Sequence, residues 1–120
     1  MVYTERQHEI WDIVAEAHDK AIKAIKPGMK CCDVDKVARD IISDYGYDDK
    51  FIHSTGHSLG LDIHETPGFS PRDETAVEEG MVITVEPGIY LEGEFGVRVE
   101  DTVAISKRGN VIGDLPLDIV

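Results

Sequence analysis

The first part of the chain has the hydrophobic repeat of an amphipathic helix. Apolar residues recur every three or four positions from Ile10 onward, which predicts a helix of about five turns between Thr4 and Lys26. Thr4 and Gln7 have the spacing of a capping box at its start. Pro27-Gly28 follows the last turn and ends the helix, because proline cannot continue the backbone hydrogen bonds.

A second apolar repeat predicts another helix directly after the first. Asp33 has the position of its N-cap, and Gly46 has the position of a C-terminal glycine. The apolar face between them consists of Val34, Val37, Ala38, Ile41 and Tyr45.

Beyond Gly46 the helical period disappears and strand patterns follow. The run 81–85 is apolar throughout and is typical of a strand buried on both faces. Residues 97–105 alternate between apolar and polar side chains, which predicts one long strand. Gly109-Asn110 predicts a turn, after which 111–112 pairs back as a hairpin. Because the helices precede the strands, the sequence predicts an α+β fold with a mostly antiparallel sheet.

Composition limits the classes of partner. The 120 residues fit one domain, and a formal charge of −12 disfavours binding to nucleic acid or an anionic membrane. No run of 18 apolar residues and no secretory signal occurs in the sequence. The two cysteines, Cys31 and Cys32, are adjacent and cannot form a disulfide framework, so we interpret them as packing residues in a cytoplasmic protein.

A histidine-rich stretch, residues 53–67, is the first candidate for chemistry. It contains His53, His57 and His64 among glycines and small residues. The step of four from His53 to His57 returns to one face in either a helix or a strand. His64 is an odd number of residues further on, so we expect a bulge or bend near Gly60 to turn it toward the other two. Three clustered imidazoles favour a metal or catalytic site over separate structural roles.

Two glutamates are the informative carboxylates. Glu86 ends the apolar run 81–85 and precedes Pro87-Gly88, where it has poor access to solvent. A buried carboxylate needs a cation, a basic partner or a proton. Glu100 has a local alternative, since Arg98 lies two residues earlier on the same strand face and can form an ion pair with it.

Taken together, His57, Glu86 and Glu100 offer one imidazole and two carboxylates from separate segments. This donor set suits Mn²⁺, Co²⁺, Fe²⁺ or Zn²⁺. With His53 and His64 nearby to orient a carbonyl group and transfer protons, the sequence predicts metal-assisted hydrolysis.

Three ordered motifs carry a family resemblance. They are His-x-x-x-Gly-His-x-x-Gly-Leu-x-x-His-Glu-x-Pro, then Val-x-Glu-Pro-Gly-Ile-Tyr, then Gly-Val-Arg-Val-Glu-Asp-Thr-Val. Together they resemble the pita-bread metallopeptidases, and most closely the branch of Xaa-Pro dipeptidases (prolidases) and aminopeptidase P. The run from Arg98 to Thr102 favours this branch over methionine aminopeptidase. The resemblance extends over nearly the whole chain.

The resemblance implies a role for each matching residue. His57 and Glu86 would bind one metal ion, Glu100 would bridge two, and Glu86 would also serve as the base for the attacking water. His53 and His64 would line the pocket for a proline-containing peptide, with His64 stabilising the tetrahedral intermediate or transferring a proton. Arg98 would hold Glu100 ionised or help to bind substrate.

The resemblance also implies what the chain lacks. Family members supply two further aspartate ligands upstream of a helix like the predicted 4–26 helix, and no aspartate here has that context. We therefore expect residues 1–120 to be the C-terminal portion of a catalytic domain, with an incomplete site, little peptidase activity and a tendency to form homo-oligomers through bare apolar surface.

Two other readings remain open. One is a pita-bread module that binds peptides without catalysis. The other is a single-metal β protein that performs redox chemistry with histidine and carboxylate ligands. Metal analysis combined with peptidase and oxygen-consumption assays would separate the three.

Overall fold

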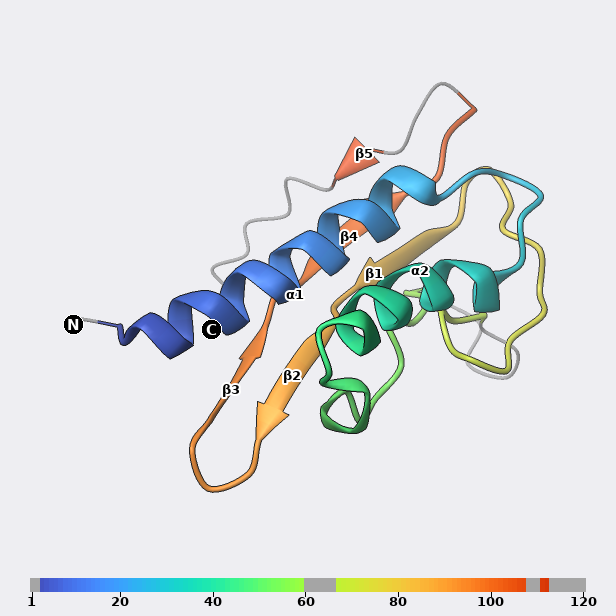
Figure 1. Cartoon of the computed structure of the whole chain (residues 1–120). Coiled ribbons are helices and arrows are strands. Elements are labelled where there is room, and N and C mark those ends of the chain that lie inside the picture. The colour runs from blue at the N-terminus through green and yellow to red at the C-terminus, as the bar shows by residue number, and fades with distance from the viewer. Residues whose placement is uncertain (1–2, 60–66, 108–110, 113–120) are drawn as a thin grey trace.

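The computed structural model describes residues 3–59, 67–107 and 111–112. Helix α1 (Glu5–Ala24) and helix α2 (Cys31–Asp44) come first, followed by a short 3₁₀ helix, η1 (Asp48–Lys50). The strands are β1 (Val82–Val85), β2 (Gly88–Leu91), β3 (Phe95–Arg98), β4 (Asp101–Ala104) and β5 (Val111–Ile112). Both helices lie together on one side of the strands (Figure 1). The predicted α+β class is confirmed.

Helix α1 begins where the sequence predicts. The Thr4 side chain accepts a hydrogen bond from the Gln7 backbone N–H at 3.1 Å, and the Gln7 side chain accepts one from the Thr4 N–H at 2.9 Å. These two bonds form the expected capping box. The helix ends at Ala24, with Ile25 already extended, and Gly28 turns the chain at a φ of 96°.

Helix α2 begins two residues earlier than Asp33, so the prediction of Asp33 as its N-cap is wrong. Lys30 occupies the N-cap position and its side chain forms no capping hydrogen bond. The backbone N–H groups of Cys31 and Cys32 instead donate to the carbonyl oxygens of Thr75 and Asp73, at 2.9 and 2.7 Å. A distant loop therefore satisfies the first turn of the helix. At the other end, Gly46 has the predicted left-handed conformation, with a φ of 90°.

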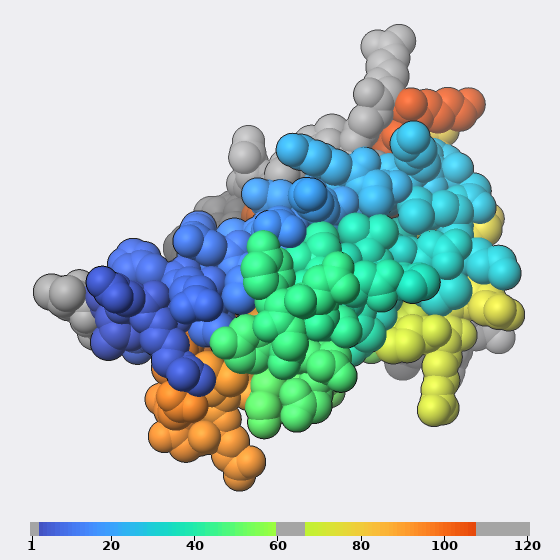
Figure 2. Space-filling model, viewed as in Figure 1, coloured from blue at the N-terminus to red at the C-terminus, as the bar shows by residue number. Residues whose placement is uncertain are grey.

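The core lies between the two helices and the strands. Figure 2 shows α1 in blue and α2 in cyan and green forming one layer over this face, with the β2–β3 hairpin in orange projecting beyond them. His18 of α1 is buried and its Nε2 lies 2.8 Å from the Asp101 carboxylate of β4, which ties helix to strand. Residues buried completely in this core include Ile10, Val14, Ala17, Ala21, Val34, Ala38, Ile42, Ile83, Val85, Ile89 and Val103.

The single strand predicted over 97–105 is wrong. Two strands, β3 and β4, occupy this region and belong to different sheets: β3 pairs with β2, and β4 pairs with β1 and β5. The interruption falls at Val99 and Glu100, opposite Glu86-Pro87 in the segment that joins β1 to β2. Proline has no N–H to donate, so the ladder of hydrogen bonds breaks there. A long antiparallel ribbon results, bent at its middle.

The remaining sequence features agree only in part, since Tyr45, predicted on the apolar face of α2, is its C-cap and is 51% exposed. Strand β5 pairs antiparallel with β4 as the predicted hairpin requires, whereas Gly109-Asn110 lies outside the described residues. Both cysteines are free thiols, and Cys31 is fully buried. Within the described part of the chain, no helix is long and apolar enough to cross a membrane.

Candidate metal and active site

The segment from Thr55 to Leu59 runs antiparallel to β1, on the side away from β4. Ser58 forms an isolated bridge with Ile83, and the Thr84 N–H donates to the His57 carbonyl at 2.9 Å. The Glu86 N–H donates to the Thr55 carbonyl at 2.6 Å. His57 therefore lies beside Thr84 of β1, two residues before Glu86.

Gly56 allows this close approach. An added Cβ at Gly56 would lie 1.7 Å from the Thr84 carbonyl oxygen, a distance that no side chain can occupy. Glycine at this position lets the His57 backbone reach β1.

His57 and Glu86 meet at the end of β1. The Nε2 atom of His57 lies 3.4 Å from Glu86 Oε2, and Glu86 is half-buried while His57 is exposed. His57 Nδ1 faces the Ser58 carbonyl oxygen at 3.4 Å. Because a carbonyl oxygen only accepts, this contact favours a proton on Nδ1, so that Nε2 of the neutral ring keeps its lone pair.

Glu86 Oε2 is buried, and no described residue donates a hydrogen bond to it. Two lone-pair atoms 3.4 Å apart repel unless a proton or a metal cation lies between them. Ligands held about 2.0–2.2 Å from a divalent ion have a comparable separation. The pair therefore fits two ligands of a metal ion.

Glu100 lies opposite Glu86 at the bend of the ribbon. Val85 pairs with Asp101 and Gly88 pairs with Arg98, so the shared register places Glu100 across from Glu86. The Glu100 side chain forms an ion pair with Arg98 at 3.5 Å, which is the local alternative that the sequence offered. Among the described residues, no group of three or more histidine, cysteine, aspartate or glutamate side chains is close enough to hold a metal ion. The structure thus joins His57 to Glu86 but does not assemble the predicted set of three.

His53 is held by two hydrogen bonds. Its Nδ1 lies 2.8 Å from the Ser54 carbonyl oxygen and carries the proton, so Nε2 accepts from the Tyr90 hydroxyl at 2.7 Å. Burial raises the pKa of that hydroxyl and Glu86 raises it further, against the opposing effect of Arg98. Tyr90 therefore stays protonated and keeps the His53 ring in one orientation.

A pocket of about 560 Å³ collects most of the predicted site residues. The Asp73 carboxylate, on the far wall, accepts hydrogen bonds from the N–H groups of Gly68 and Thr75, at 2.8 and 2.9 Å. Burial raises the pKa of Asp73, but these hydrogen bonds outweigh it and hold the pKa below its usual value. His64 lies outside the described residues. The pocket is lined by His53, Ser54, Gly56, His57, Gly68, Ser70, Asp73, Glu86 and Arg98.

Two residues that help to form the site, Tyr90 and Asp73, were not predicted from the sequence. Tyr90 belongs to the Glu-Pro-Gly-Ile-Tyr motif, but its contact with His53 spans 37 residues and has no local signal. Asp73 lies in a loop between elements, where sequence periodicity gives no information. The glycine spacing was the one usable clue for Tyr90, because its ring covers Gly88 and Gly96, where an added Cβ would come within 3 Å of it.

A bent antiparallel ribbon that is backed by two helices and carries histidine and glutamate at the bend defines the C-terminal half of the pita-bread fold. The match to a family model supports this class independently, since residues 1–107 fit metallopeptidase family M24. The chain belongs to this family.

Known proteins support the assignment. The chain is 56% identical over 105 residues to the Xaa-Pro dipeptidase of Pyrococcus furiosus, a match covering 88% of this chain and 30% of that protein. The solved structure of the prolidase from Pyrococcus furiosus superposes with a TM-score of 0.88 at 53% identity, over 92% of this chain and 33% of that one. An X-Pro aminopeptidase from Thermotoga maritima gives a TM-score of 0.86 at 42% identity, over 92% of this chain and 32% of that one. The chain spans about 30% of the length of the curated relatives it matches.

Proposed function

We propose that this chain forms the C-terminal portion of the catalytic domain of a metal-dependent peptidase that hydrolyses Xaa-Pro bonds in dipeptides or at peptide N-termini. The observation that carries the proposal is the buried Glu86 Oε2 atom, which has no described hydrogen-bond donor and lies 3.4 Å from His57 Nε2. The identity to Xaa-Pro dipeptidases over 88% of the chain supports the substrate class.

In this proposal His57, Glu86 and Glu100 would hold the divalent metal ions. When bound, such ions lower the pKa of a water molecule and polarise the scissile carbonyl group. Mn²⁺, Co²⁺, Fe²⁺ and Zn²⁺ all suit nitrogen and oxygen ligands of this kind. Glu86, as a carboxylate with poor solvent access, also acts as the base that takes the proton of the attacking water.

The other residues bind and orient the peptide. Tyr90 fixes the His53 ring, whose Nδ1–H and Nε2 are both engaged, so His53 forms a rigid wall of the pocket. Arg98 forms an ion pair with Glu100 at 3.5 Å and lines the same pocket, where it would help to bind substrate. His64 transfers a proton or stabilises the tetrahedral intermediate, as the family resemblance implies.

The 120-residue chain alone has an incomplete site in this proposal. The resemblance requires two further aspartate ligands, and the described residues contain no cluster of three metal-binding side chains. We expect one weak metal position and little or no turnover of Xaa-Pro dipeptides by this chain.

A second candidate function is a pita-bread module that binds peptides without catalysis. The pocket lined by His53, Ser54 and Arg98 supports it, because a peptide could occupy such a pocket without a metal ion. The two candidates differ in the role of Glu86: a peptide-binding module does not need a buried carboxylate oxygen without a hydrogen-bond donor.

Calorimetric titration with Co²⁺ tests the proposal. We expect the chain to bind Co²⁺ with an affinity that falls at least tenfold in Glu86→Gln and in His57→Ala. Absence of Co²⁺ binding, or equal binding by both variants, would favour the peptide-binding module. Full turnover of an Xaa-Pro dipeptide by the 120-residue chain would instead disprove the incomplete site.

A further inference from the structure

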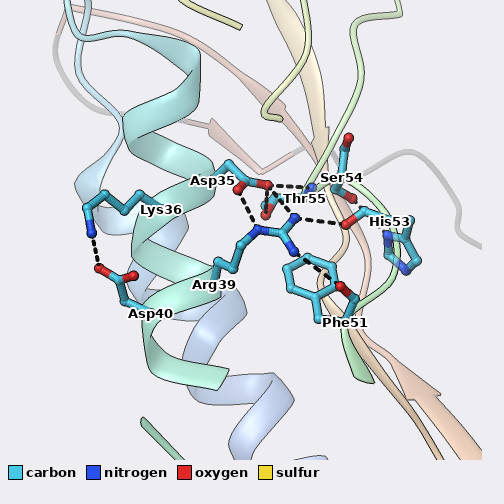
Figure 3. A network of polar contacts seen from close by, with 8 residues as sticks. All are labelled: Asp35, Lys36, Arg39, Asp40, Phe51, His53, Ser54 and Thr55. Carbon is cyan, nitrogen blue, oxygen red and sulfur yellow. Dashed lines mark hydrogen bonds and ion pairs between the residues drawn. The ribbon is translucent and has the colours of Figure 1, made fainter. Parts of the chain in front are cut away.

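Helix α2 carries two ion pairs of the same spacing with very different surroundings. Lys36 and Asp40 form an exposed pair, with Nζ and Oδ2 2.7 Å apart and both side chains more than half exposed. Asp35 and Arg39 form the second pair one residue earlier, and the Asp35 side chain is 1% exposed. Figure 3 shows the first pair pointing away from the candidate site and the second pointing toward the segment that contains His53.

The Asp35 carboxylate is fully satisfied. Its oxygens accept from Arg39 Nε at 2.8 Å and Nη2 at 3.1 Å. They also accept from the Thr55 backbone N–H at 3.1 Å and the Thr55 hydroxyl at 2.9 Å. Four donors around one buried carboxylate fix the position of Thr55 relative to α2 (Figure 3).

Arg39 extends this network to the backbone of the segment that leads into the site, residues 51–53. Its guanidinium donates to the carbonyl oxygens of Phe51 and His53, at 3.1 and 3.0 Å, and lies 4.2 Å above the Phe51 ring. One planar group thus holds four acceptor atoms, two of them main-chain carbonyls. A lysine ammonium cannot reproduce this fork.

Thr55 connects the network to the candidate metal ligands. Its N–H is bound by Asp35, and its carbonyl accepts from the Glu86 N–H at 2.6 Å. A single residue therefore spans the distance from α2 to Glu86, and His57 follows two residues later. Sheet hydrogen bonds hold the chain from Thr55 onward, whereas α2 side chains hold it from Phe51 to Thr55.

Stability alone is a weak reason for such a pair. Buried ion pairs lose much of their attraction to desolvation, and apolar replacements of equal volume are often no less stable. Positioning of the metal ligands is a stronger reason for the pair, because removal of a group that orients a metal ligand lowers metal affinity 10- to 100-fold.

We propose that Asp35 and Arg39 are positioning residues, which hold the backbone from Phe51 to Thr55 so that His53 and His57 line the pocket together with Glu86. This inference rests on the proposed function for its consequence in metal binding, but its geometric part stands independently.

The test compares Arg39→Lys and Thr55→Val with Asp40→Asn, the matched control in the exposed pair of the same helix. Co²⁺ titration measures metal binding at the site, and ¹⁵N NMR of the imidazole rings reports the tautomer and hydrogen bonding of His53 and His57 without metal. We expect Arg39→Lys and Thr55→Val to weaken Co²⁺ binding at least tenfold and to shift both ring signals. Asp40→Asn should stay within twofold, with unchanged ring signals.

A different result is expected if Asp35 and Arg39 only stabilise the fold. If Arg39→Lys and Thr55→Val lower the melting temperature but leave the ring signals and Co²⁺ affinity unchanged, the proposal is overturned. If Arg39→Lys does not fold, Thr55→Val decides, because it removes one hydroxyl at nearly constant volume. If the wild-type chain binds no Co²⁺, the proposed function fails while the ring signals still decide this inference.

Discussion

Glu86 lies opposite Glu100 in the register that the two halves of the ribbon share. Both residues fall in the break between strand pairs, where Pro87 cannot donate and the Val99 N–H donates to the Pro87 carbonyl at 3.3 Å. The same proline that interrupts the ladder therefore brings two carboxylates to one bend. Of these two carboxylates, Glu100 is matched with Arg98 at 3.5 Å, whereas Glu86 Oε2 has no donor among the described residues and needs a cation or a proton.

Replacing Glu86 should separate function from stability. In Glu86→Gln, a neutral amide takes the place of a buried carboxylate oxygen that has no described donor. We expect the metal-free protein to gain about 1 kcal/mol of unfolding free energy, measured by urea denaturation, while Co²⁺ affinity falls at least tenfold.

Glu92→Gln in the exposed β2–β3 turn is the control, and it should change neither quantity. A loss of stability in metal-free Glu86→Gln would mean that the native carboxylate has a protein partner, and the argument for a cation at this position would fail.

Gly56→Ala should displace the His57 segment from β1. The new methyl group would lie 1.7 Å from the Thr84 carbonyl oxygen, so the two chains must move apart. We expect a loss of at least about 2 kcal/mol of unfolding free energy and faster hydrogen exchange at the Thr84 and Glu86 amides, which donate to this segment. Ser54→Ala, two residues earlier and exposed, should leave exchange at both amides unchanged. Native-like exchange in Gly56→Ala would show that the close approach does not exist in solution.

Local signals in the sequence were sufficient for the start of α1 and insufficient for that of α2. The capping box uses Thr4 and Gln7, which are three residues apart, so the sequence contains all of the information. The first turn of α2 is satisfied by carbonyl groups of Asp73 and Thr75, about forty positions further along the chain. Sequence pattern also missed the division of 97–105 into two strands, since the break is imposed by Pro87 in the facing segment of the ribbon.

The candidate site divides in the same way. His57 and Glu86 are recognisable because each stands next to a residue that shapes the backbone, Gly56 and Pro87. The structure brings the two side chains together. Tyr90 and Asp35 support the site through contacts distant in sequence, to His53 and Thr55, whereas the Asp73 carboxylate is held by N–H groups of its own loop. Asp35 has the helical spacing of an ordinary surface ion pair with Arg39, and only the fold shows that it is buried.

The two adjacent cysteines should differ in reactivity. Burial raises the pKa of the Cys31 thiol to about 11 from 9.0, and the negative charges of Asp73 and Cys32 add to this effect. A shift of this size lowers the thiolate fraction at pH 8 roughly a hundredfold, so a thiol reagent should label Cys32 first. Cys32→Ser should leave a protein that reacts slowly at pH 8.

The sign of the shift also predicts a dependence of stability on pH. Because the folded state binds the Cys31 proton more tightly, this contribution to stability is complete below pH 9 and is lost as the pH rises toward 11. Urea denaturation of wild type and Cys31→Ala across this range measures it, and the wild type should lose more stability. Equal slopes for the two proteins, or rapid labelling of Cys31 at pH 8, would contradict a buried thiol.

Self-association of this chain should depend on an apolar pocket at the start of α1. The pocket has a volume of about 400 Å³, and Tyr3 and Trp11, at its edge, are 59% and 51% exposed. Exposed aromatic side chains around a pocket favour contact with another protein surface. We expect size-exclusion chromatography with light scattering to show a concentration-dependent oligomer that Trp11→Lys converts to monomer. Ile52→Lys, at an apolar residue 74% exposed elsewhere, should keep the oligomer, and a monomeric wild-type chain at every concentration would refute the prediction.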